Sequence, residues 1–152
     1  MKKSAITMLS AALILTLTAC GSSGNEKSAD NSGNEPVILT ADADKVEVLY
    51  FHLTRRCATC NAIEDVAKKT IDTQFAEMVT AEKVVMKSIN YETDDGRYIA
   101  QQHGITGQGL LLVAGSAKVD LTATGFMNAM SNPKKLEEEI TNNINELLKT
   151  VK

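Results

Sequence analysis

Two cysteines separated by two residues, Cys57 and Cys60, stand between a β-like run and a helix-like run of this chain. The preceding run, residues 45–52, is rich in β-branched and aromatic residues on both faces, which predicts a central strand covered on two sides. Thiols at this spacing lie within one helical turn of each other and can close and reopen a disulfide. The pair therefore predicts a strand–helix junction that is equipped to move two electrons.

The third cysteine, Cys20, ends an apolar segment near the beginning of the chain. Lys2 and Lys3 precede this segment, which is too short for a membrane-spanning helix and ends in small residues. The ending Leu17-Thr18-Ala19-Cys20 resembles the lipobox of bacterial lipoproteins, in which the cysteine is acylated and becomes the first residue of the mature chain. The resemblance implies a signal peptide over residues 1–19 and a lipid anchor at Cys20 that faces outside the cytoplasm. An ordinary cleaved secretory signal is the alternative.

The segment that follows Cys20 is polar. Residues 21–35 carry no large apolar side chain, so residues 20–36 are predicted to be a solvated tether. Removal of residues 1–19 lowers the basic count from 16 to 14 against 19 acidic residues, which moves the net charge from −3 to about −5. A mildly acidic chain without a basic cluster argues against nucleic acid as a partner. Residues 37–152 have the length of one small domain, expected to be a monomeric head.

Strand-like and helix-like patterns alternate along this head. Apolar residues at helical spacing predict helices over residues 60–69, 70–82, 94–103 and 133–150. Apolar and β-branched runs predict further strands over residues 83–90, 110–113 and 118–124. The order β-α-β-α-β-β-α, with the dithiol at the start of the first helix, resembles the thioredoxin fold. That resemblance implies an α/β domain with a central, mixed four-stranded β-sheet flanked by helices.

A short block around the dithiol carries a narrower resemblance. Tyr50-Phe51-His52, with Arg56-Cys57-Ala58-Thr59-Cys60 and Ile63-Glu64, is similar to the thioredoxin-like lipoproteins known as a subunit of a nitrophenyl-compound reductase encoded among arsenic-resistance genes. This similarity implies that the head is an accessory electron carrier for the reduction of nitroaryl or organoarsenical compounds.

Two positions depart from the thioredoxin pattern. Gly107-Gln108-Gly109 stands where thioredoxins place a cis-proline against the disulfide, so the dithiol is expected to be more open on that side. Phe51 aligns with the buried acid that is thought to shuttle a proton in thioredoxins. Proton transfer in this chain is therefore expected to use water or another side chain.

The two sulfurs are expected to have different roles. Cys57 at a helix N-terminus meets unpaired backbone N–H groups, and Arg55 and Arg56 add two cations, so its pKa is expected to fall below about 8.5. Cys57 is then the nucleophile and Cys60 the buried resolving thiol. For Arg55 and Arg56 a solvated pair at a loop tip is the alternative. The expected partners are a protein thiol or disulfide and a membrane electron donor, with the Cys57–Cys60 disulfide serving in place of a cofactor.

Two alternatives to a redox role concern the same thiols. A structural disulfide is one, although a bridge across two residues constrains little of the unfolded chain. Binding of a soft ion, trivalent arsenic or Cu(I), is the other, whereas zinc would need two further ligands. His52, at the end of the first strand, is a possible ligand or proton acceptor, or else a packed histidine. The methionines beyond the signal segment form no close cluster and are interpreted as core and loop residues: Met78, Met86, Met127 and Met130.

Overall fold

The structure, a computed structural model, describes residues 44–151. Their elements in chain order are β1 (Val46–His52), α1 (Ala58–Gln74), α2 (Ala76–Thr80), β2 (Val84–Asn90), α3 (Asp94–Gln102), β3 (Gly109–Ala114), β4 (Ala117–Asp120), α4 (Thr122–Asn128) and α5 (Pro133–Leu148). The predicted signal peptide, Cys20 and the tether lie outside the described residues. Within residues 44–151, no helix has the length and apolar character needed to cross a membrane.

The four strands form one open, mixed sheet in the order β2-β1-β3-β4. β1 runs parallel to β2, with Val46 opposite Val84, and antiparallel to β3, with Leu49 opposite Leu111. Every residue of the two central strands, β1 and β3, is buried. Strands that are covered on both faces need apolar side chains on both faces, which accounts for the apolar run of β3 and for Val48 to Phe51 of β1. The predicted thioredoxin-like α/β fold is confirmed.

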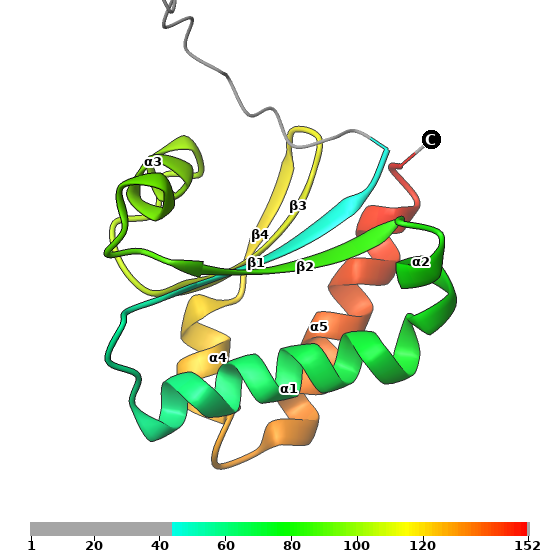
Figure 1. The fold of residues 1–152 in the computed structure, drawn as a ribbon. Coiled ribbons are helices and arrows are strands. Elements are labelled where there is room, and N and C mark those ends of the chain that lie inside the picture. The colour runs from blue at the N-terminus through cyan, green and yellow to red at the C-terminus, as the bar shows by residue number, and fades with distance from the viewer. Residues whose placement is uncertain (1–43, 152) are drawn as a thin grey trace, which may run out of the picture. The chain divides into compact units, whose positions relative to one another are not determined.

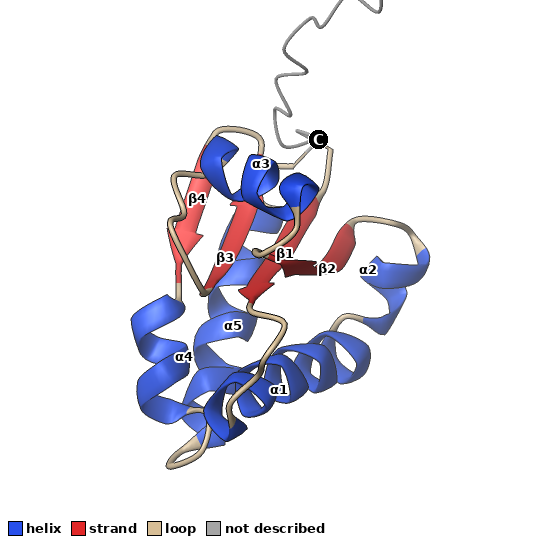
Figure 2. Cartoon of the chain, turned by 60° about the vertical axis from the view of Figure 1, so that its left-hand side comes forward, coloured by secondary structure: helices blue, strands red, loops and turns tan. Residues whose placement is uncertain are grey.

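Helices cover both faces of the sheet. Figures 1 and 2 show α3 on one face, and α1, α4 and α5 together on the other. Alternate residues of β1 therefore enter different cores. Val48 and Tyr50 join the larger core beneath α1 and α5, whereas Leu49 and Phe51 join the smaller core beneath α3. This alternation decides which side chains of β1 can reach the dithiol.

Helix α1 begins beside the carboxyl end of β1 and is held there by its buried face. Cys57 is its N-cap residue, with extended backbone angles φ −84° and ψ 166°. Ile63, Ala67 and Ile71 recur at helical spacing and are buried in the larger core. Each such aliphatic burial contributes about 1.5–3 kcal/mol for a side chain of the size of isoleucine. The first turn of α1 is thus fixed by packing further along the helix.

Two predicted elements differ from the structure. The predicted strand over residues 118–124 is wrong beyond Asp120, because residues 122–128 form helix α4. Gly125 of this helix faces Ile63 of α1, and a methyl group at Gly125 would lie 3.4 Å from Ile63, in van der Waals contact. The predicted helix over residues 70–82 is interrupted at Phe75, whose backbone angles of φ −125° and ψ 22° separate α1 from α2.

Candidate functional site

The disulfide between Cys57 and Cys60 lies at the first turn of α1, and its Cα atoms are 5.0 Å apart. Cys57 is exposed, whereas Cys60 is only 2% exposed and forms part of the core. The backbone N–H of Cys60 donates a hydrogen bond of 3.1 Å to Cys57 Sγ, so the sulfur accepts the bond that an N-cap side chain normally accepts. An N–H donor and the positive end of the helix dipole both stabilise negative charge on that sulfur.

Tyr50 lies directly beneath the dithiol, which the sequence comparison with thioredoxins did not indicate. Its hydroxyl donates a buried hydrogen bond of 2.7 Å to the carbonyl oxygen of Cys60. Phe51, which aligns with the buried acid of thioredoxins, instead points into the core beneath α3. The polar group of β1 that faces the dithiol is therefore a phenol. Burial raises the pKa of Tyr50 above its ordinary value, and the nearby charge of Arg56 offsets part of this rise.

Replacement of Tyr50 by phenylalanine is expected to lower the free energy of unfolding by about 1 kcal/mol at neutral pH, because the hydrogen bond to Cys60 is lost. The wild-type phenol ionises more readily in the unfolded chain than in the folded one. Stability of the wild type should therefore fall as the pH rises from about 10 through the raised folded-state pKa. Urea unfolding over this alkaline range measures both effects.

The Tyr50→Phe variant should show a shallower alkaline loss of stability than the wild type. Tyr98→Phe, which removes a phenol hydroxyl from an exposed tyrosine of α3, is the matched control. Equal slopes in the wild type and the Tyr50→Phe variant would show that burial does not perturb this phenol.

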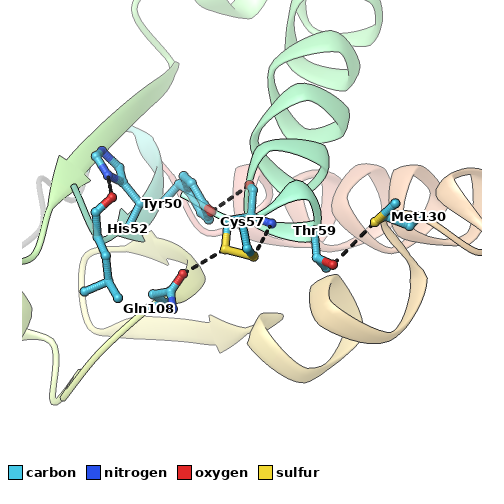
Figure 3. Close-up of a disulfide and its surroundings, with 8 residues drawn as sticks. Tyr50, His52, Cys57, Thr59, Gln108 and Met130 are labelled. Atoms are coloured by element: carbon cyan, nitrogen blue, oxygen red, sulfur yellow. Dashed lines mark hydrogen bonds between the residues drawn. A yellow bond between two sulfur atoms is a disulfide. The ribbon is translucent and has the colours of Figure 1, made fainter. Parts of the chain in front are cut away.

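Gln108 covers the side of Cys60 that was expected to be open. It stands in the loop between α3 and β3, and its Oε1 atom lies 3.0 Å from Cys60 Sγ (Figure 3). The sheet register brings it there, because Gly109 pairs with Phe51 near the end of β1. A glutamine side chain thus occupies the side of the disulfide that thioredoxins fill with proline.

The two arginines before Cys57 differ in their surroundings. Arg56 forms an ion pair with Glu64 on α1, and its Nη2 donates a hydrogen bond of 3.3 Å to Ser88 Oγ on β2. Glu64 therefore balances much of the positive charge of Arg56. Arg55 is exposed, and no ion pair joins it to any residue in the described part of the chain. A role of either arginine in stabilising the Cys57 thiolate stays a prediction.

His52 is 8% exposed at the end of β1. Its Nδ1 atom lies 3.0 Å from the carbonyl oxygen of Leu53, and its ring packs 5.9 Å from the ring of Tyr50, centroid to centroid. Figure 3 shows the imidazole directed away from the disulfide. Within residues 44–151, no hydrogen bond joins His52 to either cysteine, so its role as proton acceptor or ligand stays a prediction.

A small polar network holds the loop that leads from β1 to the dithiol. The backbone N–H of Thr54 donates a hydrogen bond of 2.8 Å to Glu92 Oε2, and Asn90 Nδ2 donates one of 3.0 Å to Thr54 Oγ1. Hydrogen bonds from Thr54 lower the pKa of Glu92, the bond from its hydroxyl more than the bond from its backbone N–H. The loop between β2 and α3 thereby fixes the approach to Cys57.

Exposed apolar side chains lie on and after α4, near the dithiol. Met130 Sδ accepts a hydrogen bond of 3.4 Å from Thr59 Oγ1, directly between the two cysteines in the sequence (Figure 3). Met127 is 68% exposed and Met130 62%, and Phe126 is also exposed. Met127 is neither a core nor a loop residue, so that interpretation is wrong for it, whereas Met130 lies in the turn after α4 as a loop residue. Their exposure depends on the position of helix α4, which the sequence pattern did not predict.

The sulfurs of Cys57 and Cys60 are the candidate ligands for a soft ion. In the part of the chain that the structure describes, no three His, Cys, Asp or Glu side chains converge as metal ligands. A soft ion bound here would be held by the sulfurs of Cys57 and Cys60, together with the ligands that the ion already carries.

The comparisons with known proteins add little to this geometry. No protein-family model matches the chain, and no curated protein matches it. One solved structure to which it is similar, described as "Structure of a malarial protein", shares 14% sequence identity at a TM-score of 0.36, over 55% of this chain and 93% of that chain. A likeness of this size supports no argument. The fold assignment rests on the element order and the sheet topology.

Proposed function

We propose that this protein exchanges thiols and disulfides with a polypeptide partner outside the cytoplasm, with Cys57 and Cys60 as the redox pair. The observation that carries the proposal is the contrast between the two sulfurs. Cys57 is exposed at a helix start and accepts the Cys60 N–H at 3.1 Å, whereas Cys60 is buried. An accessible sulfur that is stabilised as a thiolate, with a sheltered sulfur beside it, is the arrangement that thiol–disulfide exchange requires.

The reaction then proceeds in two exchanges. The Cys57 thiolate attacks one sulfur of the partner's disulfide, that bond breaks, and the partner's other sulfur leaves as a thiolate. Cys60 loses its proton to solvent and attacks Cys57 Sγ, which forms the Cys57–Cys60 disulfide and releases the partner's second thiolate. Two electrons have passed to the partner, and its thiolates take up protons from solvent. A membrane dithiol donor restores the reduced head by the reverse exchanges.

The surface around Cys57 suits a polypeptide partner. Met130 exposes an apolar side chain that contacts Thr59 at the helix start, and Phe126 and Met127 are exposed on α4, the helix just before it. Methionine side chains adapt to different apolar contacts, which fits a partner segment of varied sequence. Glu64 pairs with Arg56 nearby, whereas Arg55 keeps an exposed positive charge close to Cys57. The exposed apolar side chains support a protein disulfide as the substrate.

The reduction potential of the Cys57–Cys60 couple tests the proposal. Because a redox pair must be reducible by physiological dithiols, we expect a potential above about −300 mV, and structural disulfides lie below that value. Equilibration of the full chain with dithiol buffers of known potential gives this number. A potential below about −300 mV, together with failure of the reduced protein to reduce a model protein disulfide, would establish that the bridge is a structural disulfide. Titration with arsenite or Cu(I) tests the metalloid-binding alternative on the same reduced protein.

The location and the partner system are further parts of the proposal. The lipobox-like ending at Cys20 supports a lipid anchor, and palmitate labelling that persisted in a Cys20→Ser variant would contradict it. The resemblance of the block around Cys57 supports a role as accessory electron carrier for a nitroaryl or organoarsenical reductase. The test adds the reduced head to membranes from cells that produce this protein. If nitroarene reduction by those membranes did not increase, that narrower role would be wrong.

A further inference from the structure

Gln108 is the polar side chain that the structure places against the buried sulfur. Its Oε1 atom lies 3.0 Å from Cys60 Sγ, and Cys60 is only 2% exposed. The other polar groups nearby are directed elsewhere. Tyr50 donates its hydroxyl hydrogen to the carbonyl oxygen of Cys60, and His52 Nδ1 faces the carbonyl oxygen of Leu53.

The two sulfurs therefore face groups of opposite character. Cys57 Sγ faces a donor, the backbone N–H of Cys60, whereas Cys60 Sγ faces an acceptor, the carboxamide oxygen of Gln108. In the disulfide Cys60 Sγ carries no proton, but after reduction it becomes a thiol at the same place. An acceptor beside a thiol favours the protonated form, and a donor beside a sulfur favours the thiolate. Reduction thus turns the contact with Gln108 into a hydrogen bond that exists only for the thiol.

We propose that Gln108 is a positioning residue that keeps Cys60 protonated in the reduced protein, and that it thereby selects Cys57 as the sulfur that attacks the partner. This inference rests on the proposed thiol–disulfide exchange. During resolution the Cys60 S–H bond breaks, its proton passes to solvent, and Cys60 Sγ bonds to Cys57 Sγ as the partner's thiolate leaves. A carboxamide does not take up this proton at ordinary pH, so Gln108 acts only by holding the thiol.

Apart from Cys57, the charged and titratable groups on the elements around Cys60 are engaged with other partners. From β1 come Tyr50, which bonds to the Cys60 carbonyl, and His52, which is directed at Leu53. From α1 and the loop before it come Glu64 and Arg56, which form an ion pair with each other. Cys57 accepts the Cys60 N–H, and a thiolate on Cys57 disfavours a second negative charge on Cys60, which acts in the same direction as Gln108.

Two near-isosteric substitutions with opposite expected effects test the proposal. Gln108→Met removes the acceptor oxygen while filling a similar volume, so the pKa of Cys60 should fall by about 0.7 units. Gln108→Glu keeps an acceptor oxygen and adds negative charge, so the pKa of Cys60 should rise by at least as much. Titration of the reduced full chain by NMR, with ¹³Cβ-labelled cysteine, follows each sulfur separately. Because the signs differ, one folded variant is enough to decide.

Gln102→Leu, at an exposed glutamine at the end of α3, is the matched control and should leave the pKa of Cys60 unchanged. A Cys60 pKa that is unchanged or raised in Gln108→Met would overturn the proposal, since a rise would show that the amide donates to the thiolate. The titration needs no partner. If the pKa moves as stated but the wild type exchanges with no disulfide, the proposed function fails and only the effect of Gln108 on Cys60 protonation stands. If exchange occurs but the pKa does not move, the role of Gln108 alone is rejected.

Discussion

Replacement of Cys57 by serine is expected to abolish electron transfer to a disulfide partner, with a loss on the order of 10³-fold or more, as when other enzymes lose their nucleophile. Cys57 carries the exposed sulfur at the start of α1, and Cys60 is too deeply buried to meet a partner's disulfide. Replacement of Cys60 by serine should have a different outcome. The first exchange still occurs, but no second sulfur releases the partner, so a stable mixed disulfide accumulates.

Single-turnover reaction of each reduced variant with a model protein disulfide, followed by non-reducing electrophoresis, separates the two results. Cys20→Ser is the matched control, since it removes the remaining cysteine and should leave the exchange rate unchanged. Transfer that persisted in Cys57→Ser would mean that the nucleophile has been assigned to the wrong sulfur. A mixed disulfide formed equally by both variants would show that the sulfurs are equivalent.

Gly96→Ala is expected to lower the free energy of unfolding by about 3 kcal/mol, at the upper end of the usual cost of overpacking. A methyl group at Gly96 would lie 1.8 Å from the carbonyl oxygen of Asn90 and 2.9 Å from the hydroxyl of Thr93. The Asn90 carbonyl is backbone, and the Thr93 hydroxyl accepts the Gly96 N–H as the cap of α3. Neither group can turn aside without loosening the start of the helix.

Gly107→Ala is the matched control, because nothing lies within 4 Å of the position that its methyl group would occupy. Alanine there should leave stability unchanged or raise it by a few tenths of a kcal/mol through the unfolded chain. Urea unfolding at neutral pH measures both variants. Equal stabilities would mean that the turn between β2 and α3 relaxes freely. Asn90 also donates a hydrogen bond to Thr54 in the loop before Cys57, so Gly96→Ala should slow disulfide exchange as well.

Local sequence pattern was sufficient for most of the fold. β1 and β3 are buried on both faces, and their apolar runs are long enough to be distinguished from the amphipathic spacing of α1 and α5. Helix α4 was missed because Val119, Leu121 and Thr122 have a strand-like composition. In the fold, α4 packs with Gly125 facing Ile63, which lies far away in the sequence. Asp120, whose Oδ1 accepts the Thr122 N–H, is the residue type in the sequence that could have indicated a helix start.

The candidate site was predictable only as far as the cysteines. Their spacing gave the bridge, and the helical pattern gave the burial of Cys60. Tyr50 and Gln108 were not found, because their places depend on which face of β1 meets α1 and on the register between β1 and β3. Counting back from Cys57 selected Phe51, although strand alternation sends that side chain to the opposite face. Residue type and spacing identify reactive atoms, whereas strand pairing determines their neighbours.

The sulfur of Cys57 also caps α1, because it accepts the hydrogen bond of the Cys60 N–H in the first turn. Folding and reactivity therefore share one atom. Serine at this position keeps an oxygen that caps a helix well, whereas alanine would leave the first turn without its acceptor at a cost of about 1 kcal/mol. Loss of function in the serine variant can therefore be attributed to the missing thiol alone. In an alanine variant, the loss of the thiol and the loss of the helix cap would occur together.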